Sequence, residues 1–221
     1  MATVLKQQHS LDSAFQKRAA GGVLCIAIGV LIIFIVTRFA FVSGGFLIVA
    51  GAVLIKNGYT YHRGAVGEGR VAAVLARLPD GWFIVHDMVV GRAQIDHIVV
   101  SPAGVYTIET KHYTGTIHGN AEQQHWSQVI NKQHKTNFYN PIKQGNGHSV
   151  ALSTFLAENG FPHFWVNTIV VFSDPHVKLK VSSSTVPVLY LAELRDYLKR
   201  QKPVMSLQSA AAIAECISSL V

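Results

Sequence analysis

Cysteine and charge are both scarce in this chain of 221 residues, and each shortage narrows the classes of protein to consider. The two cysteines, Cys25 and Cys216, lie in apolar segments and have no partner at the spacing of a metal site. We therefore expect both to be buried and reduced, which excludes a disulfide framework. Charged residues make up only 14% of the chain, whereas apolar residues make up 49%. That balance is too apolar for an ordinary soluble domain and indicates a membrane segment.

Two further patterns are missing. The eleven histidines form neither an HxH nor an HExxH pattern, so most are expected to make surface or ordinary polar contacts. No internal repeat or low-complexity tract is present. The net charge is +7, but much of it flanks an apolar N-terminal region. The remainder permits nucleic-acid binding without requiring it.

The apolar residues concentrate in two uncharged runs, 19–37 and 39–55, which Arg38 separates. Each run is near the roughly 20 residues that a helix needs to cross a bilayer. The pattern predicts a transmembrane helical hairpin over 19–56 that follows a cytoplasmic N-terminal segment, 1–18. Six glycines would let the two helices pack closely. They are Gly21, Gly22, Gly29, Gly44, Gly45 and Gly51.

Basic residues flank the outer ends of this hairpin, with Lys17 and Arg18 before it and Lys56 after it. The positive-inside rule then places both termini in the cytoplasm, so we expect a multi-pass protein of the inner membrane in contact with the lipid bilayer. A cleaved signal peptide is the alternative, but the first run is long for one and leads into more apolar sequence.

The remaining chain predicts an α/β domain over 61–175, which strands and helices in 176–221 complete. A helix is expected to follow Gly67-Glu68-Gly69, and residues 119–139 are expected to form a loop with short edges. Asn140-Pro141 is a strong helix start, because asparagine caps and proline suits the first turn. The order helix, strands, helix, strand favours a mixed sheet flanked by helices.

The most informative stretch is 94–111, which reads as two apolar strands joined by a turn at Ser101-Pro102-Ala103-Gly104. Three charged residues, Asp96, Glu109 and Lys111, sit inside these strands. If the loop is even-numbered and centred on Pro102-Ala103, Asp96 lies across from Glu109 with Cβ atoms roughly 5 Å apart. Two carboxylates at that separation favour a bound Mg²⁺ or Mn²⁺, with Lys111 beside it.

Two alternatives stay open for this stretch. A three-residue loop with a bulge would shift the register by one residue and separate the faces. The three charges could instead form a buried salt bridge in a plain hairpin.

These residues together resemble the NERD domain, the nuclease-related domain, over roughly 62–175. The matching residues are Gly67-Glu68, Gln94-Ile95-Asp96-His97, Gly104 to Lys111, Trp126, and Asn140-Pro141 with Gln144. That family is similar to the restriction-endonuclease-like superfamily of the PD-(D/E)XK motif. The resemblance therefore implies a restriction-endonuclease-like mixed sheet flanked by helices.

By the same resemblance, Asp96 and Glu109 match the two acids of the motif and Lys111 its lysine. Glu68 matches an acid that completes the metal shell, and Gln144 a polar residue that lines the site. Ile95 stands where the motif has proline. For Glu68 the simpler reading is an acid in the first turn of a helix, and for Gln144 an ordinary surface residue. Mg²⁺ or Mn²⁺ would be the cofactor, held by Asp96, Glu109 and Glu68.

A basic and aromatic stretch precedes Gln144. Its lysines Lys132, Lys135 and Lys143 alternate with His134, Phe138 and Tyr139, so it is either a nucleic-acid contact or a solvated loop.

Two classes of function remain. The first is a membrane-anchored, divalent-metal-dependent nuclease that hydrolyses phosphodiester bonds, with DNA favoured over RNA and with a homo-oligomer as one form. The second is a non-catalytic binding or signalling module that keeps the nuclease fold at the membrane.

Overall fold

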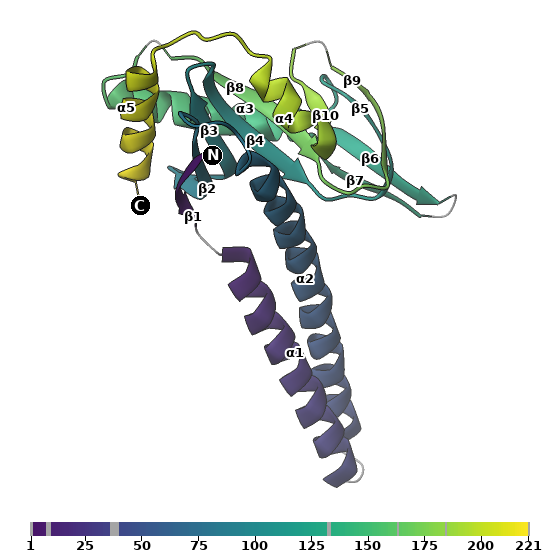
Figure 1. Cartoon of the computed structure of the whole chain (residues 1–221). Coiled ribbons are helices and arrows are strands. Elements are labelled where there is room, and N and C mark those ends of the chain that lie inside the picture. Colours follow the sequence, from purple (N-terminus) through teal and green to yellow (C-terminus); the bar gives the residue numbers. More distant parts are fainter. Residues whose placement is uncertain are drawn as a thin grey trace. The chain divides into compact units, whose positions relative to one another are not determined.

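The computed structural model describes residues 2–7, 10–35, 40–131, 134–162, 164–183 and 185–220. The chain divides into two compact units. Residues 9–66 form a helical unit, and residues 1–8 together with 67–221 form an α/β unit. Figure 1 shows the elements of both units in the order of the sequence. The site residues predicted from the sequence all belong to the α/β unit, so that unit is described in more detail.

The helical unit consists of α1 (Ser10–Ile35) and the first part of α2 (Ala40–Leu75). A Cβ atom added at Gly22 would lie 2.7 Å from the Gly51 carbonyl oxygen, so the two backbones touch where the glycines meet. Close packing at glycine is thus confirmed for this pair, whereas a Cβ at Gly45 would meet nothing within 4 Å. Arg38 lies outside the described residues.

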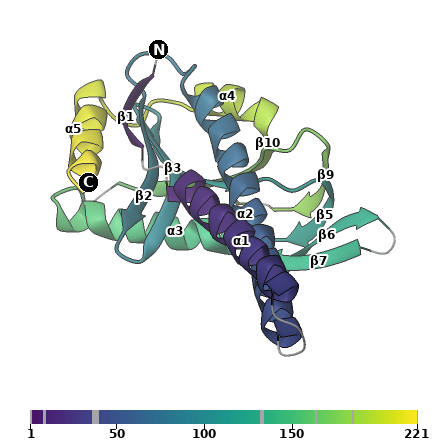
Figure 2. The ribbon, with the colours of Figure 1, turned by 90° about the horizontal axis from the view of Figure 1, so that it is seen from below.

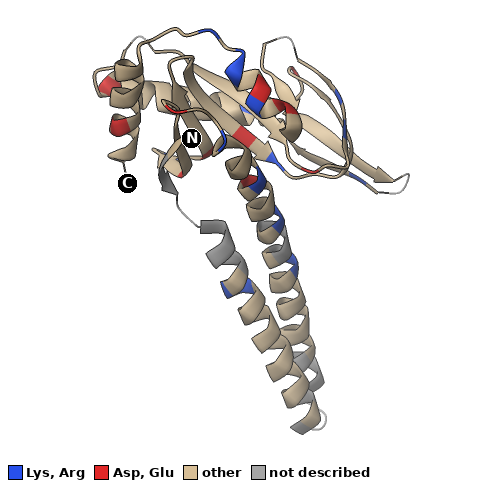
Figure 3. Ribbon diagram, in the orientation of Figure 1, with Lys and Arg blue, Asp and Glu red and all other residues tan. Residues whose placement is uncertain are grey.

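Charge is sparse on the described parts of the helical unit (Figure 3). Across the residues that the structure describes, no helix combines the length and the apolar character that a membrane crossing requires.

The α/β unit is built on a mixed six-stranded sheet, as the sequence predicts. Its order is β1 (Thr3–Gln7), β2 (Phe83–Val90), β3 (Ala93–Ser101), β4 (Gly104–Lys111), β8 (Val166–Phe172) and β10 (Val188–Tyr190). Strands β2, β3 and β4 are antiparallel, whereas β8 runs parallel to β4 and to β10. Valine and isoleucine dominate the central strands, because branched side chains suit a sheet that is covered on both faces.

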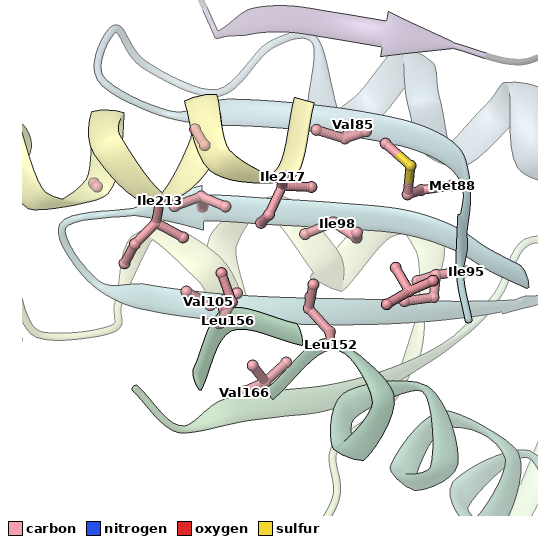
Figure 4. Packing of buried hydrophobic residues seen from close by; sticks show 14 residues of the cluster. Val85, Met88, Ile95, Ile98, Val105, Leu152, Leu156, Val166, Ile213 and Ile217 are labelled. Carbon is pink, nitrogen blue, oxygen red and sulfur yellow. The ribbon is translucent and has the colours of Figure 1, made fainter. Parts of the chain in front are cut away.

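Helices cover both faces of this sheet (Figures 1 and 2). Helices α3 (Pro141–Glu158) and α5 (Leu207–Ser218) supply Leu152 and Ile213 to a core on one face, which Figure 4 shows. On the other face, the end of α2 and α4 (Leu191–Lys199) supply Leu75 and Leu194 to a second core. Because both faces of the sheet are covered, the Glu109 side chain on β4 is enclosed by protein.

A second sheet replaces the loop that the sequence predicted at 119–139. Its order is β7 (His134–Tyr139), β6 (His125–Asn131), β5 (Gly115–Asn120) and β9 (Val177–Ser182). Trp126 anchors it, because its ring is buried and stacks on Phe172 with ring centroids 6.4 Å apart. The polar composition of this segment suggested a loop, but Trp126 joins a buried cluster with Ile117 and Val177, and hydrogen bonds to β5 hold the strands.

The predicted start of one helix was also wrong. The helix expected to begin at Gly67-Glu68-Gly69 is instead the last part of α2, which runs without a break from Ala40. Glycine weakens a helix but does not end it when packing supports the backbone, and Gly67 is packed closely here.

Candidate active site

The register of the β3–β4 hairpin decides where its charged side chains lie. His97 pairs with Ile108, and Ser101 pairs with Gly104, so Pro102 and Ala103 form a two-residue turn. The even-numbered loop is confirmed, and the three-residue loop is wrong. Gly104 has a φ of 131°, a conformation that disfavours residues with a Cβ atom.

Asp96 directly precedes His97, the first residue of β3 that pairs with β4, and it lies next to Glu109. Its Oδ2 atom accepts a hydrogen bond of 2.7 Å from the backbone N–H of Thr110. Burial raises the pKa of Asp96 well above its ordinary value, and the negative charges of Glu109 and Glu68 add to the shift. The three carboxylates are therefore close enough to repel one another.

Glu109 is almost completely buried in β4, with an exposed fraction of 1%. Its Oε1 atom lies 2.6 Å from Lys111 Nζ, and its Oε2 atom lies 3.2 Å from His148 Nδ1. No hydrogen bond forms at the second contact, so Oε2 is a buried acceptor without a hydrogen bond and its contact with His148 is electrostatic. Burial alone would raise the pKa of Glu109, but His148 and Lys111 outweigh it and lower the pKa, which keeps the carboxylate ionised.

Lys111 shares the face of β4 that Glu109 occupies, because side chains two residues apart point the same way. Its Nζ atom donates to Glu109 Oε1 and also to Gln144 Oε1 at 3.0 Å. Burial would lower the pKa of Lys111, but the Glu109 carboxylate outweighs it and raises the pKa. Lys111 is therefore an ammonium group, suited to neutralising negative charge rather than to accepting a proton.

Helix α3 brings Gln144 to Lys111 because its start is fixed and its approach to the sheet is close. Asn140 caps the helix by accepting from the Ile142 backbone N–H at 2.9 Å, as the sequence predicts. At Gly145, an added Cβ would lie 2.5 Å from Thr168 Cγ2, so only glycine fits between α3 and the sheet without a shift. Gln144 is therefore half-buried and accepts a hydrogen bond from Lys111, and its role in a site stays a prediction.

Glu68 reaches the same acids from α2. It lies far from the N-terminus of that helix, so the simpler reading as a first-turn acid is wrong. A Cβ added at Gly67 would lie 2.6 Å from His112 Cβ, which shows how closely α2 passes the end of β4. Burial raises the pKa of Glu68 to about 7, and the charges of Asp87 and Glu109 contribute.

Sequence reasoning missed two members of this cluster, Asp87 and His148. In the β2–β3 ladder, His86 pairs with His97 and Met88 pairs with Ile95. Asp87 therefore stands across from Asp96. It is buried, has a φ of 51°, and accepts a hydrogen bond of 2.6 Å from Gln94 Nε2. The sequence could have indicated Asp87, because it is an acid inside the apolar strand predicted over 82–90. The same pattern pointed to Asp96.

Of the three lysines predicted to bind nucleic acid, the two that the structure describes lie on different elements. Lys132 lies outside the described residues. Lys135 is exposed on β7 of the second sheet. Lys143 precedes Gln144 in α3, and its Nζ atom lies 3.4 Å from Gln124 Oε1. Of these, Lys143 is the one whose place in the chain adjoins the acidic cluster.

Comparison with known proteins agrees with this geometry. The model of the family described as NERD, nuclease-related domain, matches residues 63–173, about half of the chain, a range that contains every acid of the cluster. An uncharacterized protein of Bacillus anthracis is 33% identical to this chain over 146 residues. The alignment covers 62% of this chain and 66% of that protein, just under two thirds of its length. No solved structure matches this chain. The family match, together with the acids and the lysine on β3 and β4, shows that the chain belongs to the nuclease-related domain family.

Proposed function

We propose that this protein is a metal-dependent nuclease that hydrolyses phosphodiester bonds of nucleic acid. The observation that carries the proposal is the convergence of Asp96, Glu109 and Lys111, with the amide of Gln144, at one end of the β3–β4 hairpin. Two acids and one ammonium group exceed what a single ion pair needs, so the cluster has carboxylate oxygens left for another cation.

The donor set fits a hard divalent cation such as Mg²⁺ or Mn²⁺. Glu109 Oε2 is buried without a hydrogen bond, and the repulsion that raises the pKa values of Asp96 and Glu68 would be relieved by a cation between them. Asp96 and Glu109 would hold the ion, with Glu68 as a third ligand. A bound divalent ion lowers the pKa of water and neutralises charge on the phosphate.

The remaining residues have roles that follow from their contacts. The Lys111 ammonium group stabilises negative charge that develops on the phosphate. Gln144 holds Lys111 in place and prevents it from turning toward solvent. Lys135, exposed on β7, and Lys143, which precedes Gln144 in α3, bind the phosphates of the substrate. We propose that this substrate is DNA rather than RNA.

The test is cleavage by the full-length protein with Mg²⁺ or Mn²⁺, on DNA and on RNA. We expect Asp96→Asn and Lys111→Met each to lower the rate on the order of 100-fold or more. The matched controls are Asp80→Asn and Lys178→Met, which change exposed residues. Cleavage that survives both site variants would show that the activity belongs elsewhere.

One observation favours the non-catalytic module instead. Glu109 and Lys111 already neutralise each other at 2.6 Å, and no group of three His, Cys, Asp or Glu side chains within the described parts of the chain is arranged to hold a metal. This candidate predicts that nucleic acid binds without being cut. Binding with no cleavage in either metal, on several substrates, would support it.

We also propose that the helical unit anchors the protein at the inner membrane, with the nuclease-related domain in the cytoplasm. The support is the two uncharged runs, 19–37 and 39–55, with basic residues at their outer ends. Large apolar side chains are also exposed on both helices, among them Leu24, Phe34 and Phe46. Extraction of membranes with alkaline carbonate tests this, since release of the protein into the supernatant would contradict it.

A further inference from the structure

A cavity of about 930 Å³ lies in the α/β unit beside the first half of β8, and none of the acids Glu68, Asp87, Asp96 and Glu109 lines it. Strand β10 pairs with β8 only from Val170 to Phe172, so the preceding part of β8 is an open edge of the sheet. Helix α3 borders the cavity on one side, and the end of α4 with the segment that follows borders it on the other. The volume is in the range of pockets that hold small ligands.

The lining of this cavity combines positive charge, aromatic rings and amides. Arg200 and Lys202 are its charged residues, and no Asp or Glu within the described residues lines it. Trp165 and Tyr197 supply the rings, and Trp165 is 81% exposed although tryptophan usually gains from burial. Asn146 adds an amide from α3. Such a lining complements an anion that also carries a flat ring.

We propose that this cavity binds a nucleotide, either free or as part of a single strand, with the base on Trp165 and the phosphate near Arg200 and Lys202. Stacking of bases on aromatic side chains beside a basic groove is a general mode of single-strand recognition. Arg200 Nε donates to the Asp196 carbonyl at 3.1 Å, which ties the guanidinium group to the end of α4. Such a ligand needs a ring on which its base can stack and cations that can pair with its phosphate. The exposed indole of Trp165 supplies the first, and Arg200 and Lys202 supply the second.

The cavity and the acidic cluster have no residue in common, although both lie along α3. The Ser149 hydroxyl group contacts the hydroxyl groups of Thr107 at 2.6 Å and Thr168 at 2.7 Å, which closes the floor of the cavity with satisfied polar groups. Glu109 lies two residues beyond Thr107 on β4. Nucleotide binding here goes beyond the proposed hydrolysis and does not depend on it.

The experiment measures binding of AMP and of a labelled oligothymidylate to the full-length protein in EDTA, so that no hydrolysis takes part. We expect both Trp165→Leu and Arg200→Gln to weaken binding about tenfold. The matched control on α4 is Arg195→Gln, which changes an exposed arginine that does not line the cavity. Asp96→Asn tests whether the probe sits at the acidic cluster instead. We expect Arg195→Gln to bind like the unchanged protein.

The two probes separate the two sources of the nucleotide. Displacement of oligothymidylate by AMP identifies a free nucleotide as sufficient, whereas binding of the oligonucleotide alone identifies a single strand. The proposal is overturned if neither probe binds, if both cavity variants bind unchanged, or if Asp96→Asn abolishes binding. It is also overturned if oligoglutamate binds as tightly as oligothymidylate, because the site would then select charge alone.

Discussion

At the scale of single residues, the site depends on how a buried carboxylate is kept ionised. Glu109 has almost no exposure to water, and its charge is supported by Lys111 and His148. Removing one partner of such a pair leaves a charge that neither water nor protein compensates. The stability of the domain and the electrostatics of the site are therefore linked through the same two residues.

We predict that Lys111→Met lowers the free energy of unfolding by about 3 kcal/mol, because Glu109 is left buried without its cation. Urea denaturation measures this effect. The double variant Lys111→Met with Glu109→Gln should recover most of the loss, since no buried charge remains. If the double variant is as unstable as the single one, the Lys111–Glu109 pair is not what supports the domain.

At the scale of elements, helix α3 is the part that completes the site. It carries Gln144 and His148, and its position depends on the cap at Asn140 and the close contact at Gly145. The same helix also lines the cavity beside β8, for example with Asn146 and Ser149. A change that moves α3 should therefore alter both places.

The first prediction for α3 concerns its cap. The Asn140 side chain accepts from Ile142 and donates to the carbonyl groups of residues 120, 121 and 123. Asn140→Ala should lower the free energy of unfolding by about 2 kcal/mol and should also reduce cleavage. The control is Ser206→Ala, which removes the cap of α5 and should cost about 1 kcal/mol without affecting cleavage. Equal losses of cleavage in the two variants would contradict a specific role for α3.

The second prediction compares two glycines of α3. Gly145→Ala places a Cβ atom 2.5 Å from Thr168 Cγ2, so the helix must shift and both stability and cleavage should fall. Gly147→Ala meets nothing within 4 Å and should raise the free energy of unfolding by up to about 1 kcal/mol through helix propensity. Thermal unfolding and the cleavage rate of the two variants test this difference. The same effect in both would show that the fit of α3 on the sheet is not limiting.

At the scale of the whole molecule, folding is coupled to pH through buried histidines. His86 and His97 lie in β2 and β3 with their Nδ1 atoms 2.7 Å apart. Burial lowers the pKa of His86 from 6.5 to about 4, so the folded chain keeps this ring neutral where the unfolded chain protonates it. The contribution of His86 to stability should therefore be complete above about pH 6.5 and should be lost as the pH falls toward 4, whereas the raised pKa of Glu68 contributes in the opposite direction over the same range.

We predict that this decrease reaches on the order of 3 kcal/mol for His86 at pH 4. Urea denaturation in EDTA across this pH range measures it. His86→Gln should remove this loss, whereas His176→Gln, at an exposed histidine, should leave the dependence on pH unchanged. The same dependence on pH in the unchanged protein and in His86→Gln would contradict the assignment.

Much of the α/β unit was predictable because its signals are local. The cap at Asn140, the turn at Pro102-Ala103 and the period of two in β4 each depend on residues near in sequence, and each is confirmed. The second sheet was missed because Trp126 is supported by Phe172, which is distant in the sequence. The unbroken course of α2 through Gly67 was missed for the same reason, since close packing on His112 and Ser173 supports it.

The order of the residues alone shows which of them carry charge inside apolar strands, and the alternation of side chains then puts Glu109 and Lys111 on one face. Which charges meet depends on the folded arrangement of the strands and helices. Asp87 stands across from Asp96, and His148 reaches Glu109, through strand register and helix packing. The cavity beside β8 likewise exists because β10 is too short to cover that strand. Distances between residues far apart in sequence follow from packing as a whole, which no local pattern encodes.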